Sequence, residues 1–503
     1  MKPTTLAAAT ATAAAVSALQ PFSPSALCSD APSAHPNIVY FLVDDMGFAD
    51  CGFNGGTQIK TPNIDALSRR GVILENYYVQ PLCSASRCSL MTGRMPNRHG
   101  IYGAIQGGQR YGLALDERIL PQLLKTAGYT TAITGKWHCG SFAPEYRPTH
   151  RGWDHQYGLM LAQMDYFKHT NGAGYPDWSR DDKPITETGY STHLIAQEAI
   201  RLIKAHATAT NVWSGSSPIQ NPKSKIENPP PLFLYIPFNA IHAPYMAPDA
   251  YKKPYANLPS SRCVTAAMLA VVDEVIGKVY ATLVETGLAD NTLIIFSSDN
   301  GGASPGTHTD NTPLRAGKGS IYEGGVRSSA FVIWPGHIAP GTRAAPPVHL
   351  VDWYPTLAAL TGADPAPHKN PLDGQNILPL LLEGKAPDRD ALLIVGTSPQ
   401  RYALRMGDWK LLVNPNSTRV DNRRPAPSDP DDEVDTETIT NTRLELYNLA
   451  TDISEKHNLA ATDPDRVKAM YTRAKAMMAD AAPSLAVTTA AEAKTAKPKG
   501  KKR

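Results

Sequence analysis

The chain has 503 residues, of which 42% are hydrophobic, and a formal net charge of +3. The hydrophobic fraction excludes wholesale disorder, and so small a net charge gives no reason to expect a nucleic acid as partner. The length exceeds an average domain, although an α/β enzyme can build most of it around a single sheet.

Residues 1–35 have the features of a signal peptide and leader. Lys2 supplies a positive charge, residues 6–19 form an uncharged, alanine-rich apolar stretch, and Val16, Ser17 and Ala18 place small residues at the spacing that a signal peptidase requires. The stretch is too short and too weakly apolar to span a membrane. We therefore predict an exported protein, periplasmic or secreted, without stable membrane insertion. A disordered N-terminal tail is the alternative interpretation.

Between residues 36 and 385, short apolar runs alternate with amphipathic segments. Strands are predicted at residues 37–43, 129–134, 231–238 and 292–297, and helices from residue 61 onward and at 116–127 and 265–286. This alternation is typical of an α/β fold with a large, mostly parallel sheet that helices cover on both faces.

A smaller C-terminal α+β subdomain is predicted for residues 386–480. Residues 402–413 and 444–449 contain short strands of a small antiparallel sheet, and a helix is expected near residues 463–480. The polar segments 205–231 and 417–442 are predicted to be surface loops. Residues 481–503 form a basic tail that we expect to be disordered.

The six cysteines give little support to a disulfide framework. They stand at positions 28, 51, 83, 88, 139 and 263, without a CxxC pair and without zinc-finger spacing. This is therefore not a scaffold built on disulfides, and the pairing of the cysteines stays open.

Residues 81–94 contain the most informative motif of the chain. Cys83 and Arg87 are four residues apart, so both lie on one face of a helix, and Gly93 is suited to end that helix. The N-terminus of a helix and the guanidinium group of an arginine both bind anions favourably. The motif predicts an anion site with a sulfur residue at its mouth; the alternative is that Cys83 is a half-cystine or a small buried hydrophobic residue.

Polar side chains follow four of the predicted strands. Parallel strands place their carboxyl ends at one edge of the sheet, where α/β proteins bind ligands. Each of these side chains alone could belong to a turn or to the surface, but their shared placement favours a common site. The residues are Asp44, Asp45, Lys136, His138, His242, Asp299 and Asn300.

The residue types indicate the chemistry of this site. Three carboxylates and one amide suit a hard cation such as Ca²⁺ or Mg²⁺ better than zinc. Arg87, Lys136 and the two histidines would supply positive charge or proton transfer around an anionic group. Lys318 lies in a glycine-bearing loop that allows a close approach to a ligand, which makes it a further candidate.

Six blocks of the chain, in order between about residues 37 and 459, resemble the formylglycine-dependent sulfatases, the type I sulfatases of the alkaline phosphatase superfamily. The third residue of their signature is usually proline and is Ala85 here. Residues 77–83 and 121–125 are most similar to the arylsulfatase B group, the N-acetylgalactosamine-4-sulfatases. The blocks are residues 43–47, 83–94, 135–138, 240–244, 298–302 and 318–325.

The resemblance implies an alkaline-phosphatase-like fold and a sulfuric ester hydrolase of the arylsulfatase type, with residues 36–385 as its catalytic domain. A formylglycine-generating maturation enzyme would convert Cys83 to formylglycine (3-oxoalanine). A hydroxyl of the formylglycine hydrate would attack sulfur and the alcohol would leave. The second hydroxyl would then eliminate sulfate and restore the aldehyde. Calcium would be bound by Asp44, Asp45, Asp299, Asn300 and the modified Cys83.

The resemblance also implies roles for the remaining residues. Arg87 would hold the formylglycine hydrate on the side of the metal. Lys136 and Lys318 would bind sulfate oxygens. His138 would orient or deprotonate the hydrate, and His242 would protonate the leaving alcohol.

The expected substrate is a sulfated sugar or glycan, because no pair of apolar, membrane-inserting helices appears. Two rival functions remain: a phosphomonoester, phosphodiester or phosphonate hydrolase of the same superfold, or an inactive protein that binds sulfated glycans. The residues proposed to contact the sugar are Arg98, His99, Gln106, Arg110, Asp165, Tyr166, His169 and Arg315.

Overall fold

The computed structural model describes residues 35–214, 230–365, 371–415 and 442–486, without the side chains of residues 210–214. Residues 1–34 of the predicted signal peptide and leader, residues 417–441 of the predicted polar loop and residues 487–503 of the predicted tail lie outside these ranges. Within them, no helix is long and apolar enough to cross a membrane.

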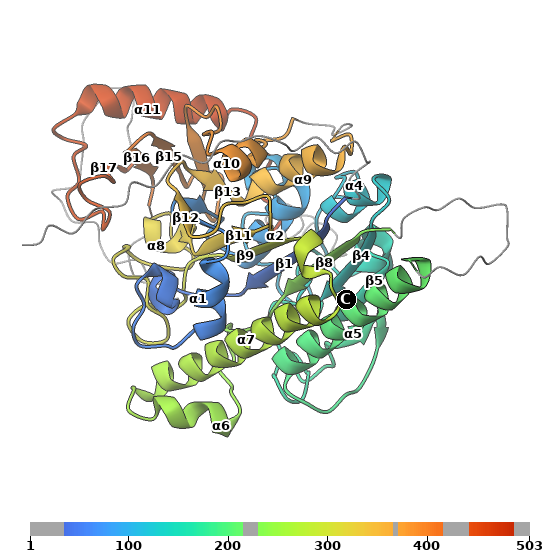
Figure 1. The fold of residues 1–503 in the computed structure, drawn as a ribbon. Coiled ribbons are helices and arrows are strands. Elements are labelled where there is room, and N and C mark those ends of the chain that lie inside the picture. Colours follow the sequence, from blue (N-terminus) through green and yellow to red (C-terminus); the bar gives the residue numbers. More distant parts are fainter. Residues whose placement is uncertain (1–34, 215–229, 366–370, 416–441, 487–503) are drawn as a thin grey trace, which may run out of the picture. The chain divides into compact units, whose positions relative to one another are not determined.

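A ten-stranded sheet forms the centre of the fold (Figure 1). Its five central strands are parallel and follow the order β9-β1-β8-β4-β5. Every residue of β1, β8 and β9 is buried. The strands are β1 (Asn37–Val43), β4 (Thr130–Thr134), β5 (His155–Gly158), β8 (Leu232–Pro237) and β9 (Thr292–Ser298).

The outer strands make the sheet mixed. β11 pairs antiparallel with both β9 and β2, and β6 pairs antiparallel with β5 and β7. The predicted large α/β sheet is confirmed, with its parallel part at the centre. The outer strands are β2 (Val72–Leu74), β6 (Ser179–Arg180), β7 (Lys183–Pro184), β11 (Ala330–Ile333) and β12 (Thr342–Ala344), and a separate small sheet contains β3 (Tyr77–Tyr78), β10 (Arg327–Ser328) and β13 (Val348–His349).

Helices cover both faces of the large sheet, as predicted. Successive residues of a strand point to opposite faces: Phe41 joins the core beneath α5 and α7, whereas Tyr40 joins the core beneath α2, α4 and α9. The first face is covered by α1 (Pro62–Ser68), α5 (Ser191–Ser214), α6 (Asp249–Lys252) and α7 (Ser260–Glu285); the second by α2 (Cys83–Thr92), α4 (Leu120–Thr126), α9 (Trp353–Thr361) and α10 (Leu378–Glu383). The short helix α3 (Pro96–His99) follows α2.

The prediction of a loop from residue 205 is wrong for its first ten residues. Helix α5 continues to Ser214, and residues 215–229 lie outside the described residues. Alanines at positions 205 and 207 favour a helix, and Ala207 is buried against the core. The helix predicted at residues 116–127 is shorter than expected, since α4 begins at Leu120.

The C-terminal part contains the predicted small α+β unit. Four antiparallel strands form its sheet, in the order β14-β15-β16-β17, and α11 (Pro464–Met477) packs on it. The core of this unit also includes Ile321, Tyr322 and Val326, so the sheet packs against the segment that follows Lys318. The boundary at residue 386 stays a prediction. The strands are β14 (Leu392–Val395), β15 (Tyr402–Met406), β16 (Trp409–Val413) and β17 (Leu444–Asn448).

Candidate active site

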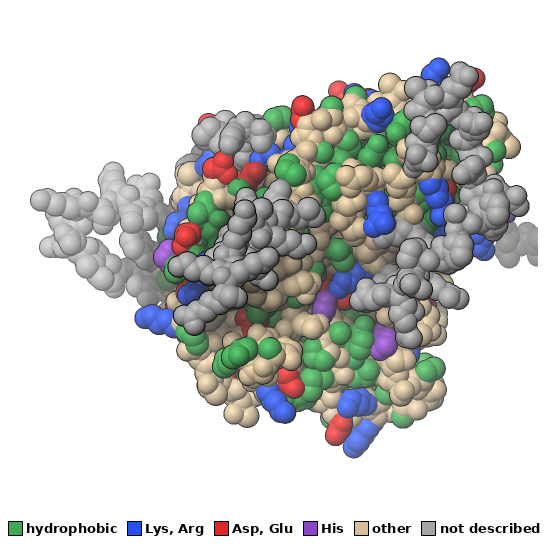
Figure 2. All heavy atoms as spheres, turned by 180° about the vertical axis from the view of Figure 1, so that it is seen from behind, with side chains coloured by type: hydrophobic (Ala, Val, Ile, Leu, Met, Phe, Trp, Pro, Cys, Tyr) green, Lys and Arg blue, Asp and Glu red, His purple; other side chains and the backbone are tan. Residues whose placement is uncertain are grey.

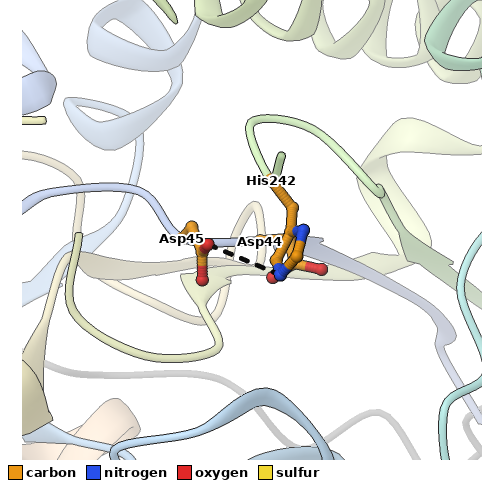
Figure 3. A group of neighbouring side chains, drawn as sticks. All are labelled: Asp44, Asp45 and His242. Carbon is orange, nitrogen blue, oxygen red and sulfur yellow. Dashed lines mark ion pairs between the residues drawn. The ribbon is translucent and has the colours of Figure 1, made fainter. Parts of the chain in front are cut away.

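The carboxylates that follow β1 and β9 meet at the edge of the sheet, as predicted. Asp45 Oδ1 accepts a 2.8 Å hydrogen bond from Asn300 Nδ2, and the Asp45 backbone N–H donates to Asp299 Oδ1 at 3.3 Å. Figure 3 shows Asp44 and Asp45 at the end of β1, beside His242 from the loop after β8. Asp45 has a φ of 63°, an uncommon conformation that turns two successive carboxylates into one site.

Backbone hydrogen bonds extend the sheet beyond the strand ends and fix these residues. The N–H of Asp44 donates to Ala240 O at 2.9 Å, and that of Asp299 donates to Val43 O at 3.0 Å. Gly301 then lies so close to the neighbouring turn that a Cβ on it would come within 1.8 Å of Gly324 O. Only glycine fits at that position.

Three cationic side chains surround the carboxylates. Arg87 donates from Nη2 to Asp299 Oδ2 at 2.8 Å and to Asp44 Oδ2 at 3.2 Å. Lys136 Nζ lies 2.5 Å from Asp44 Oδ2, and Lys318 Nζ lies 2.7 and 2.8 Å from the two carboxylate oxygens of Asp45. Arg87 and Lys136 are fully buried, and Lys318 is slightly exposed.

Burial and these charges set the ionisation of the group. Burial opposes ionisation of Asp44, but Lys136, His242 and Arg87 outweigh it and hold the pKa of Asp44 well below its usual value. Burial, together with the charge of Asp44, raises the pKa of Asp299 to about 7 against the attraction of Arg87. The three carboxylates therefore lie so close together that a further cation bound among them would stabilise their ionised forms.

The oxygens at this edge of the sheet fit a hard cation. Asp44 Oδ1 and Asn300 Oδ1 are buried and accept no hydrogen bond from any described residue. Ligand atoms of Asp44, Asp45 and His242 lie within 4.8 Å of one another. Buried oxygens without partners cost free energy, and carboxylate and amide oxygens are the ligands that Ca²⁺ takes. The residues present thus fit calcium.

Cys83 is the first residue of α2, and its side chain is buried. The predicted helix is confirmed: it ends at Thr92, and Gly93 follows with a φ of 69°. Burial raises the pKa of the Cys83 thiol, whereas Lys136 and Lys318 act to lower it. Cys83 thus lies in the field of the same cations that hold Asp44 and Asp45, and it is a free cysteine rather than a half-cystine.

His138 has the geometry of a neutral base. Its Nε2 lies 2.9 Å from Ile105 O, and a carbonyl oxygen can only accept, so Nε2 carries the proton. Nδ1 is buried without a hydrogen-bond partner among the described residues. Burial, aided by Lys136 and Arg87, lowers the pKa of His138 well below its usual value. His138 is therefore neutral, and its unprotonated Nδ1 is available to accept a hydrogen bond.

His242 presents its other nitrogen to the site. Its Nδ1 lies 2.7 Å from Ala243 O, so Nδ1 is the protonated atom, and Nε2 lies 3.7 Å from Asp45 Oδ2. Burial and Lys318 lower the pKa of His242, whereas Asp45 acts to raise it. Tyr166 holds this residue in place, because its hydroxyl donates to His242 O at 2.8 Å and to Asn239 O at 2.6 Å.

Several residues of the predicted sugar-binding rim, the set proposed to contact the sugar, have other contacts. Tyr166 and His99 are buried, and His99 Nε2 lies 3.1 Å from Ser89 Oγ. His169 is buried and stacks on Trp178. The support that Tyr166 gives to His242 was missed, since no sequence signal marks a contact between residues 76 positions apart.

Other residues of the proposed rim differ in exposure and contacts. Gln106 and Arg110 are exposed, and Arg98 pairs with Asp373. Arg315 stacks on Tyr322 and donates to Glu455 O at 2.6 Å, whereas Asp165 accepts from the N–H groups of Phe167 and Lys168 within its own turn. On the face turned toward the viewer in Figure 2, histidine, basic and acidic side chains gather in a hollow near its middle.

The family model and two related proteins that match this chain are all sulfatases. Residues 36–363 match the family model described as Sulfatase. Arylsulfatase J of Mus musculus is 36% identical over 389 residues, which make up 75% of this chain and 61% of that protein. N-acetylgalactosamine-6-sulfatase of Homo sapiens is 34% identical over 377 residues, 70% of this chain and 67% of that protein. The chain thus spans less than two thirds of arylsulfatase J.

Comparison with solved structures agrees with this family match. The structure of Ps i-CgsB in complex with k-i-k-neocarrahexaose is 30% identical, with a TM-score of 0.76 over 92% of this chain and 98% of that chain. PsFucS1 sulfatase from Pseudoalteromonas sp. is 27% identical, with a TM-score of 0.68 over 89% and 90%. The phosphonate monoester hydrolase of Agrobacterium radiobacter, at 18% identity and a TM-score of 0.55 over 88% and 95%, shares the fold alone. The likeness to arylsulfatase B stays a prediction, but the chain belongs to the sulfatase family.

Proposed function

We propose that this protein is a sulfuric ester hydrolase that removes sulfate from a sulfated carbohydrate, with a formylglycine made from Cys83 and a bound calcium ion. One observation carries the proposal. Cys83 begins a ten-residue helix at a buried site where Arg87, Lys136 and Lys318 surround the carboxylates. This arrangement places the residue that would be modified where an anionic group is best stabilised.

Asp44, Asp45, Asp299 and Asn300, with the modified Cys83, would hold the calcium ion. When bound, calcium would supply positive charge for the sulfate oxygens, and formylglycine would supply the nucleophilic oxygen. The implied partner is a formylglycine-generating maturation enzyme. The two buried, unpartnered oxygens of Asp44 and Asn300 support this ligand set.

Lys136 and Lys318 are the residues best suited to bind the sulfate oxygens. Each ammonium group has three N–H donors and pairs with a single carboxylate, Asp44 or Asp45. Further donors therefore remain for a ligand. Arg87 instead divides its donors between Asp299, Asp44 and the carbonyl oxygen of Lys136, which suits it to orient the metal-binding carboxylates and the hydrate.

The two histidines would transfer protons at opposite stages. His138 Nδ1, without a partner among the described residues, would accept a proton from the hydrate. His242 Nε2, which faces the site, would donate a proton to the leaving alcohol oxygen. The negative charge of a bound sulfate ester would raise the pKa of His242 and so favour its protonated form.

The names of related proteins support a carbohydrate as the carrier of the sulfate. Ps i-CgsB binds k-i-k-neocarrahexaose, and other relatives are N-acetylgalactosamine-6-sulfatases. Export to the periplasm or the outside of the cell is part of the proposal, supported by Lys2 and the apolar residues 6–19.

The first test is mass spectrometry of the Cys83 peptide from protein matured in its native host. Formylglycine is the expected result, and an unmodified thiol in active protein would contradict the proposal. The protein should then release sulfate from a panel that contains N-acetylgalactosamine 6-sulfate, k-i-k-neocarrahexaose and 4-nitrophenyl sulfate. Cys83→Ala is the matched inactive control.

The same panel separates the rival functions. Faster turnover of 4-nitrophenyl phosphate or of a phosphonate monoester than of every sulfate would favour a phosphate or phosphonate hydrolase of the same fold. Binding of the sulfated sugars without turnover, by protein whose Cys83 is unmodified, would favour an inactive glycan-binding protein.

A further inference from the structure

Two aromatic side chains from different loops stack at the active site. The rings of Tyr245 and His308 have centroids 3.9 Å apart and planes inclined by 20°. Tyr245 follows His242 by three residues in the loop after β8, and His308 lies in the loop after β9. Because β8 and β9 flank β1, the two loops come from either side of the strand that carries Asp44 and Asp45.

The Tyr245 side chain lies within the field of the charged pocket. Burial raises the pKa of Tyr245, Asp45 raises it further, and Lys318 acts to lower it. Both Tyr245 and His308 nevertheless keep part of their surface exposed. The pair is thus an accessible aromatic surface next to the groups proposed to bind sulfate.

The loop that carries Tyr245 is held firmly from beneath. Tyr166 donates to His242 O at 2.8 Å, and Tyr190 donates to Met246 O at 2.9 Å. Both tyrosines are buried and stack on each other. Two hydrogen bonds from the core therefore fix the backbone on both sides of Tyr245.

The loop that carries His308 is held by helix α7. The carbonyl oxygen of His308 accepts from Arg262 Nη1 at 2.9 Å and from Thr265 Oγ1 at 2.5 Å. Arg262 also pairs with buried Asp50 at 2.7 Å. The two rings are thus positioned before any ligand binds, which lowers the entropic cost of binding.

An aromatic surface beside a sulfate pocket matches the shape of a sulfated sugar. A pyranose ring presents polarised C–H groups on its faces, and the face of an aromatic ring is electron-rich. A sugar whose sulfate reaches Lys136 and Lys318 must hold its ring at the mouth of that pocket. We propose that Tyr245 and His308 form a subsite that stacks on the pyranose ring carrying the sulfate, an inference that rests on the proposed carbohydrate sulfatase function.

The test compares saccharides with inorganic sulfate, which reaches the charged pocket but has no ring. In the full-length matured enzyme, Tyr245→Ala should raise KM for N-acetylgalactosamine 6-sulfate or k-i-k-neocarrahexaose about tenfold, while the inhibition constant of inorganic sulfate stays unchanged. His308→Ala should act in the same direction, and Tyr245→Phe, which keeps the ring, should restore the wild-type KM. Tyr175→Ala removes a tyrosine that is 69% exposed and serves as control.

The outcomes separate this subsite from the proposed function. Saccharide turnover with an unchanged KM in Tyr245→Ala overturns the subsite and leaves the sulfatase function intact. Turnover of 4-nitrophenyl sulfate but of neither saccharide in the wild type contradicts the carbohydrate substrate, and the subsite with it. A parallel rise in the inhibition constant of inorganic sulfate would show a damaged charged pocket and would also overturn the subsite.

Discussion

Lys410 of β16 places its ammonium nitrogen 2.8 Å from Glu323 Oε1, and neither side chain is exposed to solvent. The same nitrogen lies 3.0 Å from Glu455 Oε1. Glu323 begins α8 (Glu323–Val326), the short helix that follows Lys318, and Tyr78 donates to its other oxygen at 2.9 Å. This buried group joins the C-terminal sheet to the segment that supports the active site.

Replacing Lys410 should destabilise the protein strongly. Lys410→Met removes one cation and leaves two buried carboxylates facing each other, and breaking a buried ion pair in this way costs about 3–5 kcal/mol. Denaturant unfolding would measure the loss. The control Lys385→Met removes an exposed ion pair with Glu383 and should leave the unfolding free energy unchanged. An equal effect of both substitutions would refute the importance of the buried group.

The same group predicts a pH dependence of stability. Burial raises the pKa of Glu455 to about 7, against the attraction of Lys410 and with the repulsion of Glu323. The folded protein therefore binds this proton more tightly than the unfolded chain, in which a glutamate has its ordinary pKa of 4.5. The resulting stabilisation is complete below about pH 4.5 and is lost as the pH rises through about 7.

Glu455→Gln isolates this contribution. The unfolding free energy of the wild type should fall from about pH 5 to about pH 8, and that of the variant should fall less, because its side chain does not titrate. Lys410 and Arg327 lower the pKa of Glu323 despite its burial. Glu323 therefore changes the unfolding free energy in a more acidic pH range than Glu455 does. Identical slopes in the two proteins would contradict the raised pKa of Glu455.

Calcium should stabilise the folded protein through Asp44 and Asn300. Removing calcium with a chelator should lower Tm, and returning calcium should restore it, since a ligand bound only to the folded state stabilises that state. Asn300→Ala should require at least about tenfold more calcium for the same Tm, because one neutral oxygen ligand is lost. Asp249→Asn, on an exposed carboxylate, should respond as the wild type does. A calcium response that Asn300→Ala leaves intact would place the ion elsewhere.

Substitution of His242 should depend on the leaving group. His242→Ala removes the proposed general acid, and loss of such a group costs about 10²–10⁴-fold in rate. A sugar alcohol needs that proton, whereas 4-nitrophenolate leaves without it, so kcat should fall far more for the sulfated saccharide. Equal losses on both substrates would show that His242 acts in another way.

The local sequence was sufficient to predict much of the candidate active site. Asp44 and Asp299 were predicted because residues after parallel strands meet at one edge of a sheet, and hydrogen bonds such as that from Asp299 N to Val43 O produce this placement. Helix α2 was predicted because Cys83, Arg87 and Gly93, which is suited to end a helix, lie within one short segment. The helix does end at Thr92, directly before Gly93. The end of α5 was misjudged, because the polar composition after residue 205 outweighed the helix propensity of its alanines.

The sequence by itself thus determined which residues follow each strand and which ones share a helix, because backbone hydrogen bonding and helical periodicity act over short distances. Only the tertiary structure decided that Tyr166 supports His242, that Tyr245 stacks on His308, and that Lys410 is buried against Glu323. These contacts join segments that are far apart in the chain, and they depend on how separate elements pack, which no local pattern of residues encodes.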